Sequence, residues 1–141
     1  GEEIQPDASV TVMMDGTDTT EESSAAVQSA RKLAQQCGCT VLVTGPVDYV
    51  TDGERVLALG NGDPLMTRVT GVGCAMGALA AACVASAPDA FTGAAACAAI
   101  LGIAGERAAA RCSRPGSFAG ALLDELDALS PAEVAEFTRI V

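Results

Sequence analysis

The chain has 141 residues, the length of one domain and enough to bury a substantial core, so we expect a single domain over residues 1–141 in which residues 1–15 are the hardest to assign. The formal net charge is −10, and the eight basic residues are spread from Arg31 to Arg139. Three Phe, one Tyr and no Trp leave few rings for base stacking. We therefore expect neither nucleic acid nor a membrane surface as a partner.

Six cysteines could form a disulfide framework or a metal cluster. The sequence has no His and no C-x-x-C pair, and three of the cysteines lie in alanine-rich helical runs, where Cys behaves as a small core residue. The N-terminal residues are acidic and have no apolar stretch typical of a signal peptide. These features favour reduced thiols and a cytoplasmic location. The cysteines are Cys37, Cys39, Cys74, Cys83, Cys97 and Cys112.

The first third of the chain predicts half of a βαβ unit. A short extended segment is expected at residues 10–14. Thr19 or Thr20 can cap the helix that follows, which has apolar residues at helical spacing up to Cys37 and ends at Gly38. Residues 40–44 (TVLVT) form an almost wholly apolar, β-branched run, which is typical of a strand covered on both faces.

A β-hairpin is predicted next. Residues 48–51 and 54–59 flank Asp52 and Gly53, and Asp-Gly between two apolar runs favours a type I′ turn with positive φ at both central residues. An antiparallel edge should therefore follow the parallel strand, and residues 60–64 should form a loop.

Helices dominate the remaining sequence. We expect them at residues 74–87, at residues 89–112, and from Ser117 to residue 129. A capping box with Ser130 then begins a last, short helix. The first two helices carry almost no polar face. Residues 69–88 have no charge and could span a bilayer, but they are mostly Ala and Gly, so a buried helix is the better interpretation.

The rest of the chain is arranged around residues 69–78 (VTGVGCAMGA), where two glycines join a loop to an apolar helix. Gly71 and Gly73 can turn successive backbone N–H groups inward, and a helix that begins near Cys74 adds its positive N-terminal end. Val72, Gly73 and Cys74 are thus predicted to form an anion hole that fits a transferring phosphoryl group. A tight turn without a ligand is the alternative.

Four sequence blocks resemble the hydroxyethylthiazole kinase family: residues 43–53 (VTGPVDYVTDG), 62–75 (GDPLMTRVTGVGCA), 104–108 (AGERA) and 115–118 (PGSF). The resemblance implies an α/β, ribokinase-like fold, of which this chain would be the C-terminal portion, with a parallel strand, a β-hairpin and packed apolar helices. It also implies that ATP is the co-substrate, with Mg²⁺, and that the hydroxyl of 4-methyl-5-(2-hydroxyethyl)thiazole is phosphorylated in thiamin biosynthesis or salvage. A homotrimer is the implied assembly.

The same resemblance implies roles for three residues. Thr44 would bind the nucleotide, Gly71 would contact the substrate, and Cys74 would accept the proton of the substrate hydroxyl, where related sugar kinases have an aspartate. Thr44 could instead be a strand-end hydroxyl bonded to the backbone, and Cys74 a buried core thiol. Asp48 and Asp63 could bind a metal, but turn-forming and solvated roles explain them better, so metal ligands stay unassigned.

The sequence also departs from the family. The family is about twice as long, so its N-terminal half would be missing here. Gln5 and Val10 would replace a nucleotide-binding arginine and a metal-associated glutamate. A non-catalytic binding or assembly fragment is therefore an alternative function, as is a kinase of the same fold acting on another small alcohol. We expect the chain to need the missing half, or further copies of itself, to cover its apolar helices.

Overall fold

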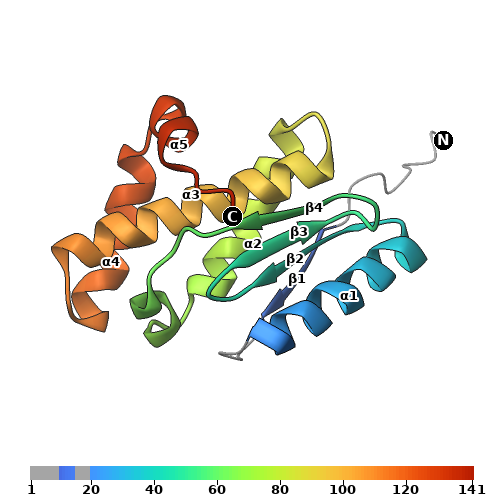
Figure 1. The fold of residues 1–141 in the computed structure, drawn as a ribbon. Helices are drawn as coiled ribbons and strands as arrows, with labels where there is room; N and C mark the ends of the chain where they lie inside the picture. Colours follow the sequence, from blue (N-terminus) through green and yellow to red (C-terminus); the bar gives the residue numbers. More distant parts are fainter. Residues whose placement is uncertain (1–9, 15–19) are drawn as a thin grey trace.

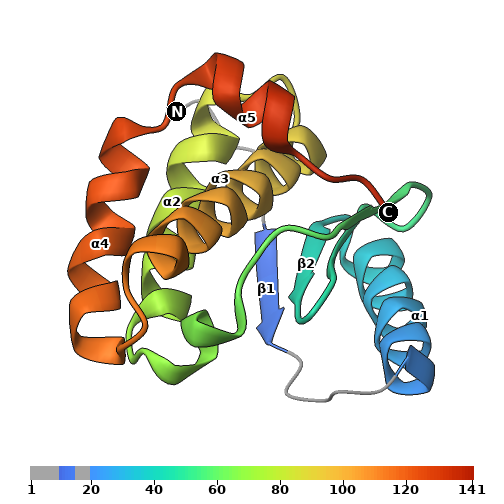
Figure 2. The same cartoon turned by 60° about the vertical axis from the view of Figure 1, so that its left-hand side comes forward.

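The computed structural model describes residues 10–14 and 20–141, with side chains described from residue 25 onward. A four-stranded sheet lies between helix α1 (Thr20–Cys37) on one face and helix α3 (Ala90–Arg111) on the other (Figure 1). Helices α2 (Val72–Ser86) and α4 (Pro115–Ala128) pack against α3 (Figure 2). The predicted α/β class is confirmed.

The strands follow one another across the sheet in chain order. They are β1 (Val10–Met14), β2 (Thr40–Thr44), β3 (Asp48–Thr51) and β4 (Val56–Leu59). β1 pairs with β2 in parallel, while β2 with β3 and β3 with β4 pair antiparallel. Helix α1 therefore connects two neighbouring parallel strands, and a hairpin extends the sheet on the other side.

The hairpin is confirmed, but its turn is not the predicted two-residue type I′ turn. Four residues separate β3 from β4, and only Gly53 among them has a positive φ, of 97°. The Asp52 carboxylate accepts hydrogen bonds from the backbone N–H groups of Glu54 and Arg55, at 3.0 and 2.8 Å. This side-chain turn holds Asp52 at negative φ and lengthens the loop.

Two helices begin earlier than predicted, α2 by two residues and the N-cap residue of α4 by three. Helix α2 begins at Val72 and not at Cys74, and α4 begins at Pro115, with Arg114 rather than Ser117 as its N-cap residue. A 3₁₀ helix, η1 (Pro64–Arg68), precedes α2. The last helix is α5 (Pro131–Phe137), and both hydrogen bonds of its predicted capping box are formed.

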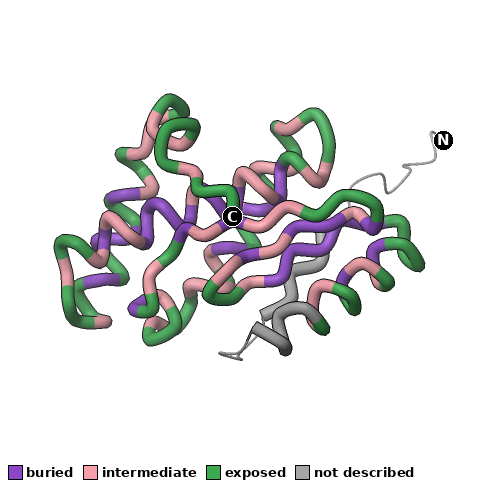
Figure 3. Tube along the Cα trace, in the orientation of Figure 1, coloured by how far each residue is buried: buried purple, intermediate pink, exposed green. Residues whose placement is uncertain are grey.

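Two hydrophobic clusters line the two faces of the sheet, as the alternation of side chains along a strand requires. Val41 and Val43 of β2 face α1 and pack with its buried alanines. Leu42 and Val50 face α3 and belong to the larger cluster, which extends to Phe118 of α4. Buried segments accordingly run through the sheet and along α3 (Figure 3).

The two apolar helices differ in burial. Half of the residues of α3 are buried, whereas in α2 only Met76 and Ala80 are. This chain by itself therefore leaves most of α2 uncovered, and the buried position predicted for α2 stays a prediction about the assembled protein. Within the described residues, α3 alone is long and apolar enough to cross a membrane, but 61% of its most apolar window is already buried inside the protein. The core position of α3 explains its apolar composition.

Candidate functional site

The N-terminal end of α2 is the centre of the candidate site. Gly71 is its N-cap residue and has a φ of 100°, in the left-handed region that glycine enters without strain. The first intrahelical bond runs from the Ala75 N–H to the Gly71 carbonyl, at 2.9 Å. The N–H groups of Val72, Gly73 and Cys74 precede that bond, and Gly71 has no side chain to cap them, so they are available to an anion.

One detail of the predicted loop is corrected. Gly73 does not adopt a positive φ, because it already lies in the first turn of α2. The anion-binding arrangement is thus a helix N-terminus approached through one glycine, Gly71, rather than a loop of two special glycines. Cys74 is the third residue of the helix and is exposed, so the alternative of a buried core thiol does not hold within this chain.

Thr44 is the last residue of β2, and a short turn leads from it into β3. The carboxyl ends of β1 and β2 and the N-terminal end of α2 lie toward the same end of the molecule (Figures 1 and 2). Ligands of open α/β sheets bind beyond the carboxyl ends of the strands. Thr44 and Gly71, the candidates for binding the nucleotide and the substrate, therefore both lie toward the end of the sheet where β1 and β2 finish.

Asp48 also lies in this region, and the expectation that its carboxylate is solvated is wrong because the side chain is buried. It is 7% exposed, and its carboxylate accepts a hydrogen bond from the Gly45 N–H at 3.0 Å, which confirms the turn-forming role. Burial raises the pKa of Asp48 to about 6, against the lowering effect of the Gly45 hydrogen bond. The charge of Asp48 also contributes to the raised pKa of Cys97 on α3, which is due first to burial.

The segment between β4 and α2 is anchored to α3. Gly102 and Gly105 permit this close contact, because a Cβ on Gly102 would come within 2.7 Å of Asn61, and a Cβ on Gly105 within 2.3 Å of the Met66 sulfur. The Glu106 carboxylate accepts a hydrogen bond from the Gly62 N–H at 2.8 Å. The AGERA block thus serves to hold the segment that leads to Gly71.

The end of the chain closes over the same segment. Buried Asn61 donates to the Phe137 carbonyl at 3.0 Å and accepts from the Arg139 N–H at 2.7 Å. The Arg139 guanidinium forms an ion pair with Glu106 and donates to the Gly60 carbonyl at 2.6 Å. Although burial opposes ionisation, Arg139 and the Gly62 N–H hold the pKa of Glu106 below its usual value. None of these partners follows from local sequence.

Acidic residues near the site do not form a metal centre. Among the residues that the structure describes, no group of three or more His, Cys, Asp or Glu side chains could hold a metal ion. Asp63 caps η1 by accepting from the Leu65 N–H at 2.8 Å, so its turn-forming role is confirmed. The described part of this chain therefore does not fit a complete Mg²⁺ site.

A cavity of about 440 Å³ lies away from the N-terminal end of α2. It is lined by the end of α1, the start of β2 and the hairpin loop, including Gln35, Thr40 and Asp52. Because Thr40 and Thr44 are at opposite ends of β2, this cavity is at the opposite edge of the sheet from the candidate site.

An uncapped helix N-terminus beside the carboxyl edge of an α/β sheet is the place where proteins of this fold class bind phosphorylated ligands. The comparisons with known proteins specify the family. The model of the hydroxyethylthiazole kinase family matches residues 1–132, so this chain belongs to that family.

Individual proteins similar to this chain carry the same family name. The chain is 48% identical over 139 residues to a hydroxyethylthiazole kinase of Akkermansia muciniphila, covering 99% of this chain and 51% of that protein. A relative from Tolumonas auensis is 46% identical over 123 residues, covering 86% and 46%. The solved hydroxyethylthiazole kinase structure from Pyrococcus horikoshii matches with a TM-score of 0.79 and 32% identity, covering 86% of this chain and 47% of that one. The chain therefore spans about half the length of the relatives it matches.

Proposed function

We propose that this chain forms part of an ATP-dependent kinase that phosphorylates the hydroxyl of 4-methyl-5-(2-hydroxyethyl)thiazole in thiamin biosynthesis or salvage. Family membership, together with the uncapped N-terminus of α2, supports this function. We further propose that the complete protein has the ribokinase-like fold, uses Mg²⁺ with ATP, and acts in the cytoplasm.

The residue roles follow from position. Thr44, at the end of β2, would bind the nucleotide, and Gly71 would contact the substrate where the backbone is free of a side chain. The N–H groups of Val72, Gly73 and Cys74 would hold the transferring phosphoryl group. Phosphoryl transfer depends mainly on positioning and on charge stabilisation, so this end of the helix can supply much of the effect.

Cys74 would accept the proton from the attacking hydroxyl. It is exposed on the first turn of α2, within reach of a ligand that the helix N-terminus holds. A thiolate need only accept the proton late in such a reaction, because bond formation to the nucleophile lags behind bond breaking.

The exposed face of α2 supports a requirement for a second polypeptide. Cys74, Gly77, Ala78, Ala81, Ala82 and Ala85 are exposed on this helix, and they are small or apolar. We propose that the half of the relatives not spanned here, or further copies of the chain in a homotrimer, covers this face and completes the site.

A coupled assay tests the function on the chain combined with a polypeptide that supplies the other half of a relative. ADP production should require the thiazole and should not occur with ribose or a hydroxymethylpyrimidine. Turnover of either of those alcohols without turnover of the thiazole would refute the assignment. The non-catalytic alternative predicts nucleotide or thiazole binding with no turnover under the same conditions.

A further inference from the structure

Basic side chains are scarce in this protein, and most of them have a partner. The chain has eight Lys and Arg against eighteen Asp and Glu. Four arginines pair with carboxylates, and Arg31 donates to the Gly53 carbonyl at 3.4 Å. The pairs are Arg55 with both Asp52 and Asp89, Arg107 with Glu133, Arg111 with Glu125, and Arg139 with Glu106. Because acidic residues are in such excess, an arginine that has no carboxylate partner is a candidate for binding an external anion.

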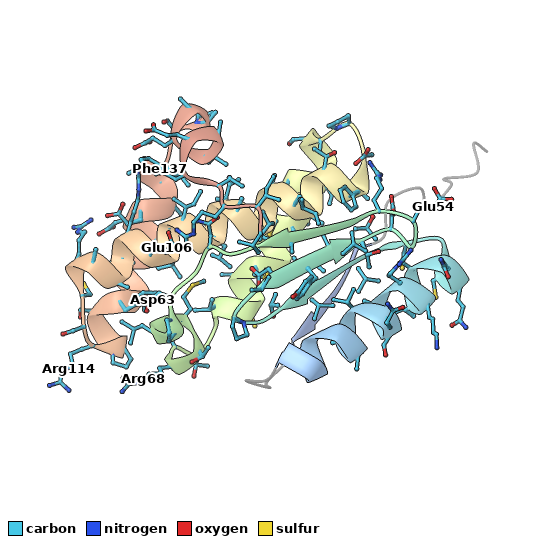
Figure 4. The ribbon with its side chains drawn as sticks, in the orientation of Figure 1. Glu54, Asp63, Arg68, Glu106, Arg114 and Phe137 are labelled. Carbon is cyan, nitrogen blue, oxygen red and sulfur yellow. The ribbon has the colours of Figure 1, made fainter. Side chains whose placement is uncertain are left out.

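Arg68 and Arg114 are exposed and form no ion pair with any residue in the described ranges. They are distant in sequence but not in space. Arg68 ends η1 and Arg114 is the N-cap residue of α4, and these two elements are in contact. Figure 4 shows both side chains extending outward at the same corner of the molecule. Two like charges thus lie at one corner of the molecule, and none of the described residues forms an ion pair with either.

The corner that carries the two arginines also carries two helix N-termini. α2 begins shortly after Arg68, and α4 begins directly after Arg114, and the first turns of both lie at this end of the molecule (Figures 1 and 2). Neither helix has a side-chain cap. The partial positive charges of the helix ends therefore add to the two full charges, in a chain whose formal net charge is −10.

We propose that Arg68 and Arg114 form a polyphosphate-binding subsite that continues from the anion site at the N-terminus of α2. The occupant is the phosphate chain of a nucleoside triphosphate. That the phosphate chain belongs to a nucleotide rests on the proposed kinase function, whereas binding of a polyphosphate as such does not. A guanidinium donates two parallel hydrogen bonds to phosphate oxygens, so two arginines side by side suit adjacent phosphate groups. The pair gives an otherwise anionic protein one place that attracts a highly charged anion.

Calorimetric titration with inorganic tripolyphosphate, and separately with ATP, tests the subsite on the full chain. Arg68→Ala and Arg114→Ala should each weaken tripolyphosphate binding about 10-fold, because each removes a charge-assisted phosphate contact. Lys32→Ala is the matched control, since Lys32 is also exposed, on α1 at the far face of the sheet, and forms no ion pair in the described ranges. It should change the affinity less than 2-fold. All three side chains are exposed, so the variants should unfold at nearly the parental urea concentration.

Three results would overturn the subsite: no binding of tripolyphosphate to the parent chain, arginine variants that bind like the parent, or an equal loss in the Lys32 variant, which would indicate only nonspecific charge attraction. A different result would refute the proposed kinase function. If tripolyphosphate binding depends on both arginines while the thiazole is never phosphorylated, the subsite stands and the proposed function falls. If the thiazole is phosphorylated equally well by the arginine variants, the proposed function stands and the subsite falls.

Discussion

The contact between α2 and α3 offers a sharp test, because a single glycine sets the distance between the two helices. A Cβ at Gly93 of α3 would lie 2.6 Å from the Val84 Cα and 2.8 Å from the Val84 nitrogen. Both atoms belong to the backbone of α2, so they cannot move aside as the end of a side chain could. Gly93→Ala must therefore push α2 away from α3 by several tenths of an ångström or more.

The magnitude follows from two opposing effects. Overpacking against backbone costs up to about 3 kcal/mol, and replacing glycine by alanine inside a helix returns about 1 kcal/mol. We expect Gly93→Ala to lower the free energy of unfolding by about 2 kcal/mol. Gly120→Ala is the matched control, because Gly120 is inside α4 and its added Cβ would meet no atom within 4 Å. That variant should gain roughly 0.5–1 kcal/mol.

Urea unfolding followed by circular dichroism measures both variants, and thermal midpoints should differ by roughly 10 °C for a chain of this size. Since α2 carries Gly71 and Cys74, the Gly93 variant should also bind tripolyphosphate more weakly, whereas the Gly120 variant should not. Equal stabilisation by the two substitutions would show that the close approach of the helices is not maintained in solution, and the reasoning would be refuted.

Three further predictions concern the site and its assembly. Cys74→Asp should retain or raise kinase activity in the completed enzyme and Cys74→Ala should lose roughly 100-fold, whereas equal small losses from both would make Cys74 structural. Asp48 has a folded-state pKa of about 6, above the value of 3.8 for a free carboxyl, so its charge lowers stability above pH 6 and this cost disappears as the pH falls toward 4. Asp48→Asn should therefore raise the free energy of unfolding by roughly 1–3 kcal/mol at pH 7 and by little at pH 4, and a gain independent of pH would contradict this. Sedimentation at low micromolar concentration should show an oligomer, with nucleotide affinity falling as it dissociates, and a monomer of full affinity would disprove the need for a partner.

Local patterns in the sequence were sufficient for most of the secondary structure. The apolar spacing up to Cys37, the β-branched run of residues 40–44 and the Ser130 capping box each act within a few residues, so the elements they predict are present. The errors are also local. The type I′ turn failed because the Asp52 side chain competes for the backbone, and α2 starts before Cys74 because Gly73 is accepted within a first helical turn.

Sequence alone also identified the position of the candidate site, since the blocks around Thr44 and Gly71 are contiguous and can be matched as they stand. It could not show why the AGERA block is there. Gly105 and Glu106 act on residues far away along the chain, by admitting Met66 and by binding the Gly62 N–H.

Only the tertiary structure decided which charges have partners. Asp48 directly follows a turn, where a carboxylate is normally solvated, and the packing of α3 over that face of the sheet is what buries it and raises its pKa. Arg68 and Arg114 are far apart in the sequence, and they lie at the same corner of the molecule because η1 and α4 come into contact. Burial and electrostatic pairing depend on distances through space, and those are set only when the helices have packed onto the sheet.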